Sequence, residues 1–454
     1  MKIRWEAIYA GLVVIVWLLT PATVAKVGDI QAVEVVILIV LGSTFIAQLH
    51  KLSFVLNHDL ARVSKHYCLF VLVAMLLALV SLRLDFYPPS VAQGDLLKTA
   101  PFLSLARLLQ ISLCAGGFIL FAQLLGHDVR LLKLAVSLYI GIGLFMAFYA
   151  VASWVCLAYT GVNLYGAYTP IDFAENIRAR ALFNEGGPYG LYAVSVIIVA
   201  LFNRYALKQM TTPALWLLVI LPVGASLLLS QSKAGAICLV AMLAWRALVR
   251  LRFRYLIAGA VALTLTFLAT PTLQVLEQYW FIYEHFDVLA LQNMNDANVV
   301  AGRLAALRVM PEIVKAHPLL GVGIGNYSLV RGDPKLGVPA TDIWDLPGIG
   351  LFSYVGDLGI PLFVYLVWIV WLPMRVVTRA HRSDIFLLLA GYQLFAQMIE
   401  VQITFFYPWA ISAMAFGYYI HLREPDALSV QGPDPAPHSL RSPRARKRSL
   451  HEPS

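Results

Sequence analysis

The chain has 454 residues, of which 60% are hydrophobic and only 13% are charged. This composition excludes an ordinary soluble domain, because so few polar residues could not cover so large an apolar core. The formal net charge of +9 accompanies apolar stretches along nearly the whole chain. We therefore attribute it to membrane topology and contact with anionic membrane lipids, and we expect no nucleic-acid partner.

Apolar stretches of about 18 residues or more recur along the chain, and each is long enough as a helix to cross roughly 30 Å of bilayer hydrocarbon. Lipid offers no water to backbone groups, so these stretches must be helices. The sequence predicts an all-α polytopic integral membrane protein with about 12 transmembrane helices. Their expected centres are Val14, Ile39, Ala74, Leu113, Ile142, Ile197, Val219, Ala241, Val261, Val364, Ala390 and Ser412.

Basic residues gather in alternate connections between these stretches and near both termini. Together these groups hold about 22 of the 34 lysines and arginines. The positive-inside rule places these connections and both termini in the cytoplasm. The cysteines all fall inside apolar stretches and show no paired spacing, so no disulfide framework or metal cluster is predicted.

Two outward connections are long, 159–188 and 271–347, and we expect the polar chemistry there, because long ordered loops usually carry function. The second is expected to form a helical cap. With these loops, residues 1–421 make one transmembrane bundle. The remainder, 422–454, is rich in proline, serine and arginine and predicts a disordered basic tail near the inner leaflet.

The segment from Gly302 to Tyr327 combines a helix pattern with a glycine turn. One apolar stripe is predicted to consist of Leu304, Leu307, Met310 and Val314, with Arg303 in the first turn of the helix. Pro311 should kink or restart the helix, and Pro318 should end it. Gly321, Gly323 and Gly325 should form the turn that follows.

Three further cations lie near outward turns. Arg178 and Arg180 precede a glycine-bearing turn, and Lys233 lies in the tight turn 230–235. Guanidinium groups stay charged and offer paired donors that match phosphate oxygens. The alternative for all three is an anchor to lipid headgroups, and Arg303 could be an ordinary residue of its helix face.

Residues 178–361 resemble the bacterial O-antigen ligases and the polymerases of O-antigen or exopolysaccharide. The matching residues are Arg178, Phe183 and Gly190, then Ser232, Lys233 and Ala234, then Gly302, Arg303, His317, Pro318, Gly321 and Gly323. Segment 355–362, VGDLGIPL, is similar to the family's LGELGIPG. The His-Asn pair of ligases is absent before it, since Gly348 and Ile349 stand there. Phe183-Asn184-Glu185 looks like the Phe-x-Glu of some polymerases, which favours a polymerase.

The resemblance implies a metal-independent glycosyltransferase of the bacterial inner membrane that needs no cofactor. Its donor would be a glycan linked to undecaprenyl diphosphate, used at the periplasmic face in lipopolysaccharide or exopolysaccharide biosynthesis. A polymerase would transfer this glycan to an acceptor on a second lipid carrier, and a ligase to lipid A core. The alternative from another class is a flippase of lipid-linked oligosaccharides, which predicts repeats and broken helices at the membrane midplane.

A diphosphate leaving group develops negative charge, which fixed cations stabilise more in the transition state than before it. We predict Arg178 and Arg303 as catalytic cations and no metal site. The predicted substrate-binding residues are Arg180, Lys233, His317, Gly321 and Gly323. Asp342 and Asp345 are the first choices for a general base, with Glu312, His285 and His317 as alternatives. His317 could instead be structural.

Two acids, Asp357 and Glu400, fall inside predicted membrane segments. Ionisable groups are costly there and commonly functional. Two interpretations of these acids remain as alternatives, a structural polar cluster around Glu400 and a contact with substrate.

Overall fold

The structure is a computed structural model that describes residues 5–23, 26–27, 30–49, 56–164, 177–183, 185–250, 257–261, 264–265, 272–293, 297–380, 384–399 and 403–423. Asn184, Glu400 and the predicted tail from residue 424 onward lie outside the described residues. The described chain is helical apart from its loops and one small hairpin, β1 (Lys26–Val27) and β2 (Ile30–Gln31). The prediction of an all-α polytopic membrane protein is confirmed.

The bundle consists of α1 (Trp5–Leu19), α2 (Ala32–Leu49), α3 (His58–Ser81), α4 (Ala100–His127), α5 (Val129–Thr160), α6 (Gly186–Phe202), α7 (Pro213–Leu229), α8 (Lys233–Arg250), α15 (Tyr354–Ala380), α16 (Asp384–Ile399) and α17 (Phe406–Arg423). Every predicted centre lies in one of these helices except Val261, which ends a short helical stretch, 257–261. Among the described residues, 5 helices are long and apolar enough to cross a membrane, and shorter apolar helices accompany them. The exact number of spans stays a prediction.

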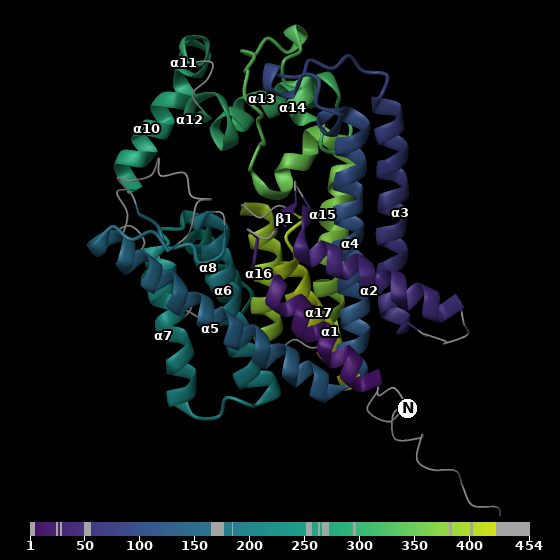
Figure 1. Cartoon of the computed structure of the whole chain (residues 1–454), viewed down its shortest axis with the longest axis vertical. Helices are drawn as coiled ribbons and strands as arrows, with labels where there is room; N and C mark the ends of the chain where they lie inside the picture. Colours follow the sequence, from purple (N-terminus) through teal and green to yellow (C-terminus); the bar gives the residue numbers. More distant parts are fainter. Residues whose placement is uncertain are drawn as a thin grey trace, which may run out of the picture.

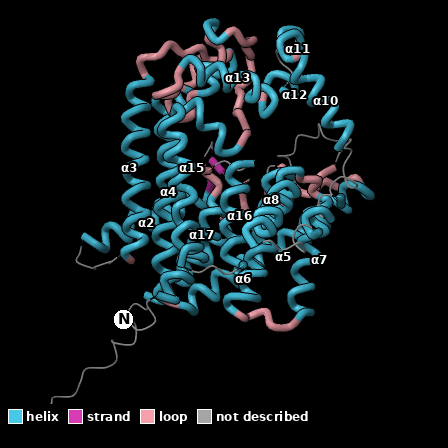
Figure 2. Tube along the Cα trace, turned by 180° about the vertical axis from the view of Figure 1, so that it is seen from behind, coloured by secondary structure: helices cyan, strands magenta, loops and turns pink. Residues whose placement is uncertain are grey.

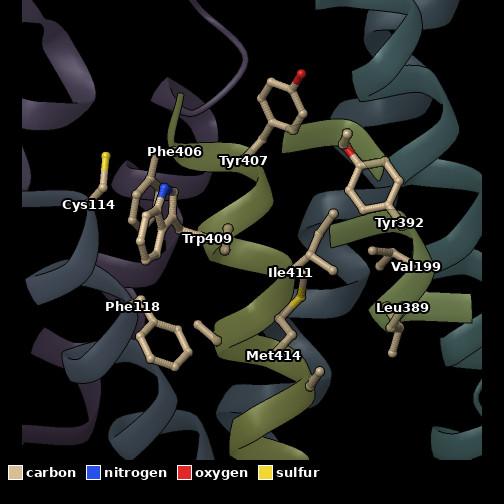
Figure 3. Packing of buried hydrophobic residues seen from close by; sticks show 14 of the residues in the cluster. Cys114, Phe118, Val199, Leu389, Tyr392, Phe406, Tyr407, Trp409, Ile411 and Met414 are labelled. Carbon is tan, nitrogen blue, oxygen red and sulfur yellow. The ribbon is translucent and has the colours of Figure 1, made fainter. Parts of the chain in front are cut away.

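Helix α17 runs through the middle of the core. Figure 3 shows Phe406 and Trp409 facing Cys114 and Phe118 of α4, while α16 lies on the other side of α17. A second close contact with α4 lies further along α17, where a Cβ atom on Gly417 would come within 2.8 Å of Leu125 Cβ. Small residues at such crossings let two membrane helices approach closely, which compensates for the weak hydrophobic drive between helices in lipid.

The helix ends that carry basic residues gather on the face opposite the cap. The Asn57 N–H, beside the start of α3, donates to Gln123 Oε1 near the end of α4 at 2.9 Å. Arg423 at the end of α17 pairs with Asp59 of α3 at 2.9 Å. The opposite end of α3 reaches the cap, since Ser81 contacts Gly323. The bundle end that holds Asp59, Arg130 and Arg423, called the basic face below, therefore lies away from the cap. The side of the membrane that it faces stays a prediction.

The outward segment 271–347 forms a helical cap in its described parts, at the top of Figure 1. Its helices are α10 (Thr272–Glu284), α11 (Phe286–Gln292), α12 (Ala297–Val300), α13 (Gly302–Ala316) and α14 (Tyr327–Val330). Seen from behind, α13 lies above α15, and α10 to α12 extend to one side (Figure 2). Helix α13 packs against α15 with a small apolar core of its own.

The predicted apolar stripe of α13 is only partly right. Met310 is buried, but Leu307 is 51% exposed. The buried face consists of Ala305, Ala306, Val309, Met310 and Ile313. The prediction followed the large apolar residues and overlooked the two alanines, whose small side chains let the helix lie close to its neighbours. Leu307 instead shares the exposed face with Arg303, one turn before it.

Helix α13 begins and ends near the predicted residues. It continues through Pro311 and ends at Ala316, with His317 as its C-cap just before Pro318. The predicted glycine turn is confirmed, because Gly321, Gly323 and Gly325 have φ values of +64°, +90° and +87°. Such conformations strain residues that carry a Cβ atom, which explains why glycine recurs here.

Candidate functional site

Arg178 lies on a segment that is bonded to the turn between α7 and α8. The Ala179 N–H donates to the Leu229 carbonyl at 3.0 Å, and Trp154 Nε1 of α5 donates to the Ile177 carbonyl at 3.0 Å. Ala179 is buried against the bundle, whereas Arg178 is exposed. The bonds on both sides therefore fix the backbone of Arg178 beside the turn between α7 and α8, with its side chain exposed.

The start of α6 fits closely against the start of α8. A Cβ atom on Gly190 would lie 2.1 Å from Ser232 Cβ, and one on Gly235 would lie 2.7 Å from the Gly190 carbonyl carbon. The Ser232 hydroxyl donates to the Gly187 carbonyl at 3.0 Å and accepts the Gly235 N–H at 3.0 Å. This contact fixes Lys233, which lies between Ser232 and Gly235, relative to the first outward loop.

We expect Gly235→Ala to lower the thermal midpoint of the detergent-purified protein, since the added methyl would press on the Gly190 backbone. Overpacking of this kind typically costs about 1–3 kcal/mol. Gly224→Ala on α7 is the matched control, because a Cβ atom there meets nothing within 4 Å. Equal midpoints for the two variants would show that this close contact does not stabilise the packing of α8 against α6.

Three predicted cations come together from separate segments of the chain. Lys233 lies within electrostatic range of both Arg178 and Arg303. Lys233 and Gly302 are the first residues of α8 and α13, and α6 begins at Gly186 beside Arg178. Helix N-termini present unpaired N–H groups and partial positive charge. Arg178, Lys233 and Arg303, called the cation cluster below, thus lie beside the starts of α6, α8 and α13, the last of which donates its Gly302 N–H to Asp345.

Asp345 anchors the start of α13 and thereby the backbone next to Arg303. Its Oδ1 accepts the Gly302 N–H at 2.7 Å, and its Oδ2 pairs with Arg331. Both side chains of this ion pair are only 1% exposed. Burial raises the pKa of Asp345, while the Arg331 charge and the Gly302 N–H oppose that rise. A role as general base stays a prediction, and the geometry favours a positioning role.

The predicted binding glycines are closely packed, Gly321 against backbone and Gly323 against the Ser81 side chain. A Cβ atom on Gly321 would lie 2.4 Å from the Asp357 carbonyl oxygen, and one on Gly323 would lie 2.2 Å from Ser81 Oγ. The Val322 and Gly323 N–H groups donate to the Gly356 and Asp357 carbonyls at 3.0 and 2.9 Å. The turn is therefore bonded to the start of α15. These close contacts explain the need for glycine at both positions without any role in substrate binding.

The other predicted residues lie apart from this packing. His317 is partly exposed, and its backbone N–H closes α13 on the Ile313 carbonyl. Asp342 is exposed on the loop before α15, and Arg180 is partly buried two residues beyond Arg178. Substrate roles for His317 and Arg180, and a base role for Asp342, stay predictions.

A small pocket with a cavity volume of about 50 Å³, partly open to solvent, lies between α4, the glycine turn and the start of α15. Its lining includes Arg107, Trp344, Gly348 and Asp357. A Cβ atom added to Gly348 would lie 3.6 Å from Arg303 Cγ, so Arg303 lies beside the pocket wall. The pocket therefore borders the cation cluster. The sequence interpretation missed Arg107. The available signal was a charged residue within an apolar helix, which is itself unusual.

The comparisons with known proteins agree with the sequence interpretation. Residues 213–367 match the family model described as O-Antigen ligase, which confirms the resemblance to the O-antigen ligases and polymerases. The match includes Lys233, α13, the glycine turn and Asp357, whereas Arg178 and Arg180 lie before it. None of the curated proteins that were compared matches the chain.

Proposed function

Because residues 213–367 match the O-antigen ligase family, we propose that the chain is a membrane glycosyltransferase that moves a glycan from undecaprenyl diphosphate to an acceptor sugar. The reaction takes place at the periplasmic face of the bacterial inner membrane, with both termini in the cytoplasm. The observation that carries this proposal is the cation cluster, in which Arg178, Lys233 and Arg303 come together beside three helix N-termini.

The cluster suits a diphosphate leaving group. As the bond between the anomeric carbon and the diphosphate oxygen breaks, negative charge grows on that oxygen, and positioned donors stabilise it. Arg303 is held by the anchored start of α13, and Arg178 by the backbone bond of Ala179 to the α7–α8 turn. The backbone of both residues is therefore fixed, which favours electrostatic preorganisation of the two cations.

Polymerisation onto a second carrier-linked glycan is the favoured reaction, because Gly348 and Ile349 stand where ligases carry their His-Asn pair. Transfer to lipid A core is the alternative, which the name of the matched family favours. An assay in proteoliposomes would offer undecaprenyl-diphosphate glycan with either a second such molecule or core lipid. A longer carrier-linked glycan indicates a polymerase, and a glycan on core lipid indicates a ligase. Movement of the glycan lipid across the bilayer without a new glycosidic bond would contradict both and indicate a flippase.

We expect Arg178→Ala to abolish product in this assay while the protein still accumulates in the membrane. The substitution removes a charge that faces the departing diphosphate and leaves the backbone bond of Ala179 intact. Product is measured from the labelled glycan at equal protein amounts. Arg130→Ala is the control, because Arg130 is an exposed arginine at the start of α5 on the basic face. Full activity of Arg178→Ala would remove Arg178 from the mechanism.

A further inference from the structure

Asp357 is a buried carboxylate that belongs to the wall of the pocket. The residue lies in the first turn of α15 and is 5% exposed. Its Oδ2 accepts the Gly325 N–H at 2.7 Å. Its Oδ1 is buried and has no well-aligned hydrogen bond among the described residues, although the Tyr327 N–H also acts on this carboxylate. Buried carboxylate oxygens are normally satisfied, so one left over at the wall of a pocket indicates a ligand group that donates to it.

The rest of the pocket suits a sugar. Trp344, Tyr327 and Tyr354 are aromatic residues of its wall. Of the two serines there, Ser328 donates its hydroxyl to the Asp345 carbonyl, and the Ser353 hydroxyl accepts the Ile349 N–H and can still donate. Aromatic faces pack against the apolar faces of sugar rings, and a few convergent polar groups fix the orientation of a bound molecule. The combination is typical of a site for one hydroxyl-rich ring.

Arg107 supplies positive charge on the opposite wall. Its side chain is half-buried on α4, and its Nη1 donates to Gln110 Oε1 at 2.9 Å. Its charge acts on both Asp357 and Tyr354. The Gly325 N–H and the Arg107 charge together position the Asp357 carboxylate, with Oδ1 left for a bound molecule.

We propose that this pocket is the acceptor-sugar subsite and that Asp357 is the general base of the transfer. This inference rests on the proposed function. The acceptor O–H bond breaks as its proton passes to Asp357 Oδ1, and the oxygen forms a bond to the anomeric carbon of the donor. The bond from that carbon to the diphosphate oxygen breaks, and its electron pair leaves on the lipid diphosphate beside the cation cluster. Asp357 then returns the proton to solvent.

The placement of the other two acids supports Asp357 over them. Both oxygens of Asp345 are occupied, one by the Gly302 N–H and one by Arg331. Asp342 is exposed and does not line the pocket. Gly348 belongs to the pocket wall and lies beside Arg303, so the pocket that contains the proposed base borders the leaving-group cations.

The test compares Asp357→Asn with wild type in proteoliposomes, using undecaprenyl-diphosphate glycan as the donor and the acceptor that wild type accepts. Asparagine keeps the shape and can still accept the Gly325 N–H. We expect kcat to fall about 100-fold or more, as is usual when a general base is lost, with retention of labelled donor unchanged. Asp357→Glu should recover part of kcat. Asp333→Asn is the matched control, because Asp333 caps a short turn of the same cap, outside the pocket.

Each other outcome has a distinct meaning. Wild-type kcat in Asp357→Asn would overturn the base while leaving the proposed function intact. If the same variant no longer retained the labelled donor, Asp357 would instead be a residue that holds the glycine turn. That result would also overturn its role as the general base. A wild-type protein that forms no glycosidic bond with either acceptor would overturn the proposed function and this inference with it.

Discussion

Replacement of Arg303 by alanine is expected to lower the rate of glycan transfer by about 100-fold or more, the usual effect of removing one donor that stabilises transition-state charge. The expected loss follows from its place in the structure. Arg303 lies on the exposed face of α13, beside the pocket wall at Gly348 and within electrostatic range of Lys233. Its backbone neighbour Gly302 is bonded to Asp345, so the guanidinium stands on an anchored helix end.

Two further variants make the Arg303 test specific. Arg303→Lys should restore little activity, because an ammonium keeps the charge but cannot form the paired contact with a phosphate. Arg308→Ala removes an arginine from the same helix, where it pairs at 3.1 Å with Asp287 on the surface, and should keep near-normal transfer. Initial rates at equal membrane accumulation decide the result. Activity in Arg303→Ala as high as in Arg308→Ala would show that Arg303 does not stabilise the departing diphosphate.

The helices could be predicted from the sequence because lipid leaves the backbone few choices. An apolar run of sufficient length must be helical, and eleven of the twelve predicted centres lie in helices of the bundle. The face of α13 was harder to predict, since its burial depends on close approach by Ala305 and Ala306. Apolar size alone pointed to Leu307, which lies at the surface. Hydropathy reports how apolar a residue is and carries no information on which helix packs against it.

The candidate site could be predicted as single residues and not as an arrangement. Arginine and lysine are residue types that bind phosphate, which is why Arg178, Lys233 and Arg303 were predicted. Their proximity depends on how the α7–α8 turn packs against the cap. The glycines of the 321–325 turn were correctly predicted as turn residues, while their backbone contacts with Asp357 became visible only in the structure. The pairing of Asp345 with Arg331 could not be predicted either, because the sequence does not show which charged side chains meet in the fold.

The ion pair between Asp345 and Arg331 leads to the second large effect, which concerns the stability of the cap. Asp345→Ala would leave the Arg331 guanidinium buried without its counter-charge, a change that typically costs about 3–5 kcal/mol. It would also remove the acceptor of the Gly302 N–H. We therefore expect faster proteolysis within the cap, a lower thermal midpoint and reduced transfer, because Arg303 loses its anchored helix end.

The companion variants separate burial of the charge from loss of the carboxylate. Replacing Arg331 by leucine in the Asp345→Ala background should recover part of the stability, since the unpaired charge is gone, but little of the transfer, since the Gly302 anchor stays absent. Asp287→Ala breaks the exposed pair with Arg308, whose side chains are 53% and 43% exposed, and should cost less than about 1 kcal/mol. If Asp345→Ala melts and digests like Asp287→Ala, the buried pair does not hold the cap. In that case the position of Arg303 must depend on the packing of α13 against α15 instead.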